Sequence, residues 1–225
     1  MSHRRTVPAI AGAIAALFLT ACSNHPGSAA TVGDESISVT TVDDVASALC
    51  AVQSGGGSSQ QLASRGARQG ALDVLISSDL SRQYGEAEGV VPDQEQVDAA
   101  LSANEQNIKA LPAEHRAIFR DTLRNYAEGQ LMLIDIGRQT LTAQGKANAT
   151  DQQAVAQGTK LRNAWAAKNL DVSVDPRYGE FANGALVSKS GSLSVAQSER
   201  ATDGDSPDPS AGWVSELPAS QKCAG

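Results

Sequence analysis

Few residues of this chain have side chains suited to catalysis or metal binding. Its 225 residues include three histidines and three cysteines, and only His115 among the histidines falls in the part that we expect to fold. A metal site needs several ligands at suitable spacings, and His115 has none. The glycines at 55–57 have no lysine after them, so they do not match a phosphate-binding loop. We expect no enzyme activity, no metal and no cofactor, with His115 exposed in the first turn of a helix.

The N-terminus has the features of an export signal. Arg4 and Arg5 precede an apolar run over 7–19, and small residues precede Cys22. The Leu-Thr-Ala-Cys sequence at 19–22 resembles the lipobox of bacterial lipoproteins, in which the cysteine receives a diacylglycerol and the signal is cut just before it. The resemblance implies removal of 1–21 and a lipid anchor on Cys22. Ordinary secretion, with no role for Cys22, is the alternative.

Two cysteines remain once Cys22 is lipidated. Export places Cys50 and Cys223 in an oxidising compartment, where such a pair tends to be joined, and we expect a disulfide between them. It would close a loop of more than 170 residues. The alternative is that Cys50 packs as a small apolar residue and Cys223 keeps a free thiol.

The charge excludes one large class of partner. The formal net charge is −7. Removal of Arg4 and Arg5 with the signal would leave 16 basic residues against 25 acidic ones, a net charge of −9. A chain this acidic repels phosphate backbones, so we expect no nucleic-acid binding. No apolar run of about 18 residues lies beyond the N-terminus, so we expect no polytopic membrane protein.

The spacing of apolar residues predicts a mainly α fold: a bundle of about five helices, with a small N-terminal β-hairpin and one late strand. The first helix is expected to begin at a cap on Thr40 or Thr41, and the second to end at Tyr84-Gly85. Asp93 with Gln96 and Thr150 with Gln153 fit capping boxes. The expected helices are 42–52, 60–83, 93–111, 112–141 and 150–169, and the expected strands are 30–32, 36–38 and 170–174.

The long helix over 112–141 has more apolar residues than one contact needs. Its expected core stripe consists of Phe119, Leu123, Tyr126, Leu133, Ile134 and Leu141. Ile118, Met132 and Ile136 fall on a different arc. Either the helix lies between two other elements, or it has a partly exposed apolar groove, in which case these three residues are candidates for contact with other polypeptides.

The Val-Gly-Asp-Glu-Ser-Ile-Ser sequence at 32–38, the helices, and the strand followed by Asp-Pro-Arg-Tyr-Gly at 175–179 together resemble the N-terminal domain of SurA- and PrsA-type chaperones. The resemblance covers about residues 30–187. It implies a small β-sheet in which the late strand at 170–174 pairs with the N-terminal hairpin at 30–32 and 36–38. Full foldases of that kind have a parvulin-type isomerase domain, and the connection at 144–149 is too short to hold one. The resemblance thus implies binding of clients without isomerase catalysis.

These observations divide the chain into a signal peptide (1–21), a flexible tether (22–29), a SurA-N-like helical domain (30–187) and a mostly disordered tail (188–225) in which Trp213 and Val214 can dock. We expect a chaperone-like lipoprotein that is bound to the lipid bilayer through Cys22, faces outside the cytoplasm and binds unfolded exported polypeptides. A scaffolding lipoprotein for one envelope partner and a prolyl-isomerase-related protein are the alternatives.

Overall fold

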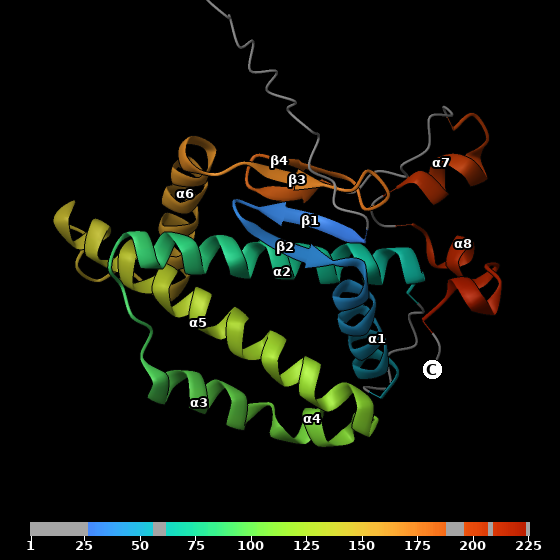
Figure 1. Cartoon of the computed structure of the whole chain (residues 1–225), viewed down its shortest axis with the longest axis horizontal. Helices are drawn as coiled ribbons and strands as arrows, with labels where there is room; N and C mark the ends of the chain where they lie inside the picture. The colour runs from blue at the N-terminus through green and yellow to red at the C-terminus, as the bar shows by residue number, and fades with distance from the viewer. Residues whose placement is uncertain (1–26, 56–61, 188–195, 207–208, 224–225) are drawn as a thin grey trace, which may run out of the picture.

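The structure is a computed structural model that describes residues 27–55, 62–187, 196–206 and 209–223 (Figure 1). Cys22, the expected signal and most of the expected tether lie outside the described residues. None of the helices in the described ranges has the length and apolar content needed to cross a membrane.

A three-stranded antiparallel sheet joins the two ends of the main domain. Its strands β1 (Ser28–Val32), β2 (Glu35–Ser38) and β3 (Val172–Val174) are arranged in the order β2-β1-β3, with Val32 opposite Val172. The tight β1–β2 turn places Gly33 at φ +60°, where a residue without a side chain is favoured. The expected pairing of an N-terminal hairpin with a late strand is therefore confirmed. The strand already begins at Ser28, so residues 28–29 do not belong to the tether.

Six helices follow the hairpin and precede β3. They are α1 (Val39–Gly55), α2 (Ser64–Ala87), α3 (Gln94–Ala103), α4 (Glu105–Ala110), α5 (Ala113–Ala143) and α6 (Asp151–Asn169). Two boundaries differ from expectation. α2 continues through Tyr84 and Gly85, and the expected third helix is divided at Asn104, whose side-chain amide donates to the Ala100 carbonyl oxygen at 2.9 Å. Such side-chain bonds compete with the helical backbone bonds.

The helix starts test the expected caps. Thr150 and Gln153 form the expected capping box at the start of α6. Asp93 accepts from the Glu95 N–H at 2.9 Å, but the Gln96 amide donates to the Asp93 carboxylate and not to a backbone group. The α1 cap is Ser38, which accepts from the Thr41 N–H at 3.0 Å. The cap therefore lies two residues before Thr40, and the expectation of Thr40 or Thr41 as the cap was wrong.

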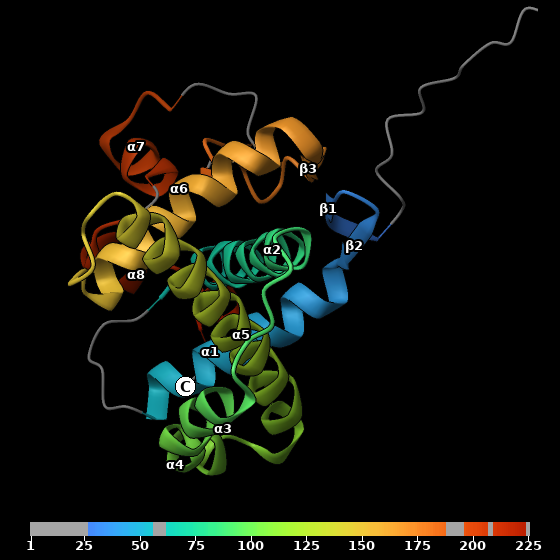
Figure 2. The ribbon, with the colours of Figure 1, turned by 90° about the vertical axis from the view of Figure 1, so that its left-hand side faces the viewer.

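α2 is the central element of the fold. Figure 2 looks nearly along its axis and shows α1, α5, α6 and the β1–β2 hairpin around it. Leu72, Ile76 and Leu80 recur at helical spacing on α2 and are fully buried. Fully burying an aliphatic side chain of this size contributes about 1.5–3 kcal/mol. This stripe packs in the main core with the buried residues of β1 and with Val42 and Val45 of α1.

α5 lies between several neighbours and contacts α1, α2, α3, α4 and α6. This confirms the first interpretation of its extra apolar surface. Met132 and Ile136 are buried, with Met132 packed directly against Gly85 of α2. Ile118 is partly buried against the main core, whereas Tyr126 of the expected core stripe is 42% exposed. Ile118, Met132 and Ile136 therefore do not line an exposed apolar groove, because neighbours on several sides pack against both arcs of the helix.

α5 and α6 cross at unusually close range. A Cβ atom on Gly158 would overlap the carbonyl oxygen of Leu133, and one on Gly137 would overlap that of Ala154. One turn beyond this crossing, Arg162 is buried with 4% exposure. Its guanidinium donates to Ser77 Oγ at 2.9 Å, to Ser81 Oγ at 3.1 Å and to the Gly184 carbonyl oxygen at 3.3 Å. Burial lowers the pKa of Arg162.

The chain after β3 contains more regular structure than its composition predicts. A second hairpin pairs β4 (Glu180–Ala182) with β5 (Ala185–Val187) through an Asn183-Gly184 turn in which both residues have positive φ. Within 196–206 and 209–223 lie α7 (Glu199–Asp205), α8 (Ala211–Ser215) and the 3-10 turn η1 (Ala219–Gln221). Val214 is buried, and the Trp213 ring lies against Gly204. These described segments are folded, in contrast to the expected disordered tail.

Candidate functional site

A disulfide joins Cys50 of α1 to Cys223, with the two Cα atoms 5.2 Å apart. It fixes the end of the described chain beside the start of α2. The Cys223 N–H donates to the Leu62 carbonyl oxygen at 2.9 Å, and Lys222 forms an antiparallel bridge with Ala63. The last described residues therefore form one wall of the surface between α1 and α2.

A groove of about 560 Å³ lies along this disulfide, between α1, the start of α2 and the start of α5. We call it the disulfide groove. Its apolar lining consists of Ala46, Cys50, Ala51, Ala67, Pro112 and Cys223. Its polar lining consists of Asp43, Ser47, Ser64, Arg68, His115 and Lys222. The groove thus offers apolar contact and hydrogen-bonding side chains over the same short stretch of surface.

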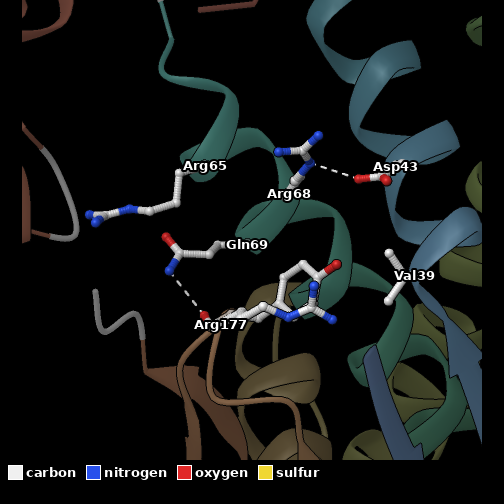
Figure 3. A pocket seen from close by; sticks show the side chains of 7 residues that line it. Val39, Asp43, Arg65, Arg68, Gln69 and Arg177 are labelled. Atoms are coloured by element: carbon white, nitrogen blue, oxygen red, sulfur yellow. Dashed lines mark hydrogen bonds and ion pairs between the residues drawn. The ribbon is translucent and has the colours of Figure 1, made fainter. Parts of the chain in front are cut away.

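A second hollow of about 280 Å³ adjoins the disulfide groove and is rich in arginine (Figure 3). We call it the arginine pocket. Arg65, Arg68 and Gln69 come from the first turns of α2, Val39 and Asp43 from α1, and Arg177 and Tyr178 from the turn after β3. Asp43 and Arg68 line both hollows, so the hollows meet at the ion pair that these two side chains form.

Two of the three arginines are already paired with carboxylates. Arg68 Nε donates to Asp43 Oδ1 at 2.7 Å. Arg177 donates from Nε and Nη2 to Asp175, the shortest contact being 2.7 Å, and this pairing lowers the pKa of Asp175 and raises that of Arg177. Arg65 donates to the Ser206 carbonyl oxygen at 3.3 Å, and among the described residues no carboxylate lies within ion-pair distance of it.

Two buried residues, Gln69 and Tyr178, form the base of the arginine pocket. Gln69 is 4% exposed, and its Nε2 donates to the Tyr178 carbonyl oxygen at 3.0 Å. Tyr178 is buried, and burial is the main cause of its raised pKa. The turn that presents Arg177 is thereby held against α2.

The opposite half of α2 has a different charged group. Asp79 is partly buried beside Glu35 and Arg82, and desolvation is the main cause that raises its pKa to about 6, with the Glu35 carboxylate adding to the shift. Arg82 pairs with Glu35 and, at 2.9 Å, with Glu86. Asp79 and Arg82 line neither the disulfide groove nor the arginine pocket.

The predicted site residues are thus distributed unevenly. Cys50 and Cys223 come together, and His115, expected to be exposed, is half-buried in the groove that they line. Ile118, Met132 and Ile136 face neighbouring helices and do not form a binding surface. Among the described residues, no group of three or more His, Cys, Asp or Glu is placed to hold a metal ion.

Sequence reasoning missed the arginine pocket. The Arg-Gly-Ala-Arg sequence at 65–68 places two arginines on one helix face, and this signal was available. Nothing in the sequence indicates that Arg177, more than one hundred residues later, comes to the same surface. That contact depends on β3 pairing with β1, which brings the following turn back to the start of α2.

Comparison with known families gives one match. The profile of the SurA-like N-terminal domain matches residues 3–144, more than half of the chain. The chain therefore belongs to the family of SurA-like N-terminal domains, a chaperone-type family. The matched segment includes the β1–β2 hairpin and α1–α5 but ends before α6 and β3, so it is shorter at that end than the expected 30–187. No curated protein and no solved structure matches the chain.

Proposed function

We propose that this protein is a membrane-anchored, extracytoplasmic chaperone-like lipoprotein that binds extended polypeptides without catalysis. Membership of a chaperone-type family supports the chaperone part, and the lipobox-like sequence at 19–22 supports the anchor. The observation that carries the proposal is the disulfide groove, where apolar and hydrogen-bonding side chains lie together on the surface. The contact residues are those of this groove, in place of Ile118, Met132 and Ile136.

The lining of the groove suits an extended polypeptide. Alanine and cysteine side chains offer apolar contact that favours no particular sequence. Ser64 and His115 offer hydrogen-bonding groups to a peptide backbone, and Ser47, whose hydroxyl donates to the Asp43 carbonyl oxygen at 2.8 Å, offers an acceptor. The N–H and C=O groups of the peptide must be satisfied when they leave water. At about 560 Å³ the groove falls in the range of about 300–1,000 Å³ typical of ligand sites. It suits a short segment of a client and leaves the rest of the client outside.

Suppression of aggregation tests the proposal. The full-length protein, in several-fold molar excess, should reduce the light scattering of an unfolded model protein. Ser47 is exposed on α1 and lines the groove, so Ser47→Trp should fill part of the groove and weaken the suppression. Ser102→Trp, at an exposed position of α3, is the matched control and should behave as the unmodified protein. No suppression by the unmodified protein would contradict the proposal, and equal suppression by both variants would exclude the groove as its site.

Two further measurements separate the alternatives. A pull-down from solubilised membranes should recover many weakly bound chains, whereas one stoichiometric partner would favour a scaffolding lipoprotein. In a proline-limited refolding assay we expect no acceleration, because the connection at 144–149 is too short to hold a parvulin-type isomerase domain. Faster refolding would favour a protein related to prolyl isomerases.

A further inference from the structure

We propose that the arginine pocket binds the C-terminal carboxylate of a polypeptide whose preceding residues lie in the disulfide groove. This inference rests on the proposed function and adds a defined end to the bound segment. The two hollows meet at the Arg68–Asp43 pair, so a chain in the groove has a direct path to the arginines. A client would then be bound by its last residues rather than by any internal segment.

The charges in the arginine pocket favour an anion, although the protein as a whole has a negative net charge. The chain has a formal net charge of −7, yet Arg65, Arg68 and Arg177 line one hollow of about 280 Å³. Asp43 and Asp175 neutralise two of these arginines. Among the described residues, the guanidinium of Arg65 has a backbone carbonyl oxygen and no carboxylate as its acceptor, and it supplies the remaining positive charge. One uncompensated charge matches a single carboxylate better than a doubly charged phosphate monoester.

Two of the three arginines, Arg68 and Arg177, are already oriented before a ligand arrives. Asp43 holds Arg68, Asp175 holds Arg177 in a forked pair, and the Gln69–Tyr178 hydrogen bond fixes the turn against α2. A site that is arranged in advance loses less conformational freedom on binding. Guanidinium groups also match the planar geometry of a carboxylate through paired N–H donors.

The adjoining groove selects a peptide over an anionic lipid. A lipid headgroup also has a single negative charge, but its acyl chains have no donors or acceptors. Acyl chains in the disulfide groove would cover the polar side chains of Ser64 and His115 with groups that neither donate nor accept hydrogen bonds, which is unfavourable. A peptide backbone satisfies those side chains while its own side chains contact the alanines.

Binding of a matched pair of peptides tests the inference. The probe is a short fluorescein-labelled peptide of alternating valine and serine, with either a free C-terminal carboxylate or a C-terminal amide, titrated with the full-length protein by fluorescence anisotropy. The free acid should bind about tenfold more tightly than the amide, because hydrogen bonds to charged groups are among the stronger ones. Added salt should reduce this ratio.

Two variants locate the effect. Arg65→Gln should reduce the affinity for the free acid towards that for the amide and leave the amide unchanged. Arg124→Gln, which removes an exposed arginine paired with Asp98 elsewhere on the surface, is the matched control and should change neither affinity. Equal binding of acid and amide to the unmodified protein would overturn the inference while leaving the proposed function intact. Failure of both peptides to bind, together with no suppression of aggregation, would contradict the proposed function itself.

Vesicles test the lipid alternative directly. Vesicles of phosphatidylglycerol should not displace the free-acid peptide beyond the effect of phosphatidylcholine vesicles. Displacement by phosphatidylglycerol that Arg65→Gln abolishes would assign the pocket to a lipid headgroup and overturn the peptide inference.

Discussion

The α5–α6 crossing and the surface between α1 and α2 use similar residue types for opposite purposes. At the crossing, small residues bring two backbones into contact, and Arg162 is 4% exposed with its donors directed to neutral oxygens. Between α1 and α2, small residues line an open groove, and the side chains of Arg68 and Arg177 are 51% and 68% exposed. Alanine, glycine and arginine therefore do not by themselves mark a core or a site.

The difference shows that stability and binding are located at different parts of α2. The second half of α2 packs against α5 and α6 through its buried face, whereas its beginning faces the two hollows. Changes at the crossing should lower stability. Surface changes at the hollows should alter binding with little effect on folding.

The disulfide is the exception to this separation, and its removal should have the largest effect. Cys50 and Cys223 close a loop across 173 residues, and a bridge of this kind contributes about 2–5 kcal/mol to the free energy of unfolding. The double variant Cys50→Ser/Cys223→Ser should lose about that much in urea unfolding. The unmodified protein in reductant should show the same loss. Two reactive thiols from Cys50 and Cys223 in the denatured, unreduced protein would show that the bridge is absent.

Gly158→Ala should have the next largest effect, because the new methyl group would overlap the backbone of Leu133. Overpacking of this kind typically costs about 1–3 kcal/mol, and contact with backbone rather than a side chain places Gly158 near the upper limit. The control is Gly70→Ala on α2, where a Cβ atom has nothing within 4 Å. It should stabilise by about 0.5–1 kcal/mol. Similar urea midpoints for the two variants would mean that α5 and α6 do not approach as closely as described.

These sites also show what the sequence could predict. The hairpin, the Thr150 capping box and the Cys50–Cys223 pair follow from local patterns or from residue type. The pairing of β1 with β3 follows from the resemblance to SurA-type domains and not from any local pattern. The burial of Met132 and Ile136 does not, because it depends on how many helices contact α5. The helical period assigns the residues of α5 to faces of the helix, but it does not show how many other helices pack against those faces.

The β4–β5 hairpin was within reach of sequence reasoning. An Asn-Gly pair between two short apolar runs, as at 183–184, is a strong hairpin signal. The burial of Arg162 was not predictable, because its acceptors come from α2 and from the β4–β5 turn. The position of Arg177 in the arginine pocket was not predictable for the same reason, because Arg177 comes close to Arg65 and Arg68 only when β3 pairs with β1.

Arg162→Met should cost about 2 kcal/mol. Methionine keeps the apolar stem but removes the donors to Ser81 Oγ and to the Gly184 carbonyl oxygen, and buried acceptors that lose a partner cost about 1–3 kcal/mol. Amide hydrogen exchange in the β4–β5 hairpin should become faster, since Arg162 ties that turn to α2. Arg138→Met, at an exposed position of α5, should change stability by less than about 0.5 kcal/mol. Unchanged exchange in the hairpin would show that Arg162 does not anchor it.

Substitution of Asp79 should have the smallest effect on the free energy of unfolding, and this effect should depend on pH. Its pKa is raised from 3.8 to about 6, so the folded state holds its proton more tightly than the unfolded state. Stability is therefore lost as the pH rises from about 4 through about 6. Asp79→Asn should remove this loss and stabilise the protein by about 1 kcal/mol at pH 7.5, a figure reduced for the solvent that still reaches the group.

The pH dependence separates this effect from ordinary substitution effects. At pH 4, Asp79 is protonated in the folded state, and Asp79→Asn should have almost no effect on urea unfolding. Asp121→Asn, at an exposed position of α5, should show no such difference between the two pH values. Peptide affinity at the groove should not respond to Asp79→Asn, because Asp79 lines neither hollow. If affinity did change with Asp79, the two parts of α2 would be coupled and the separation of packing from binding would not hold.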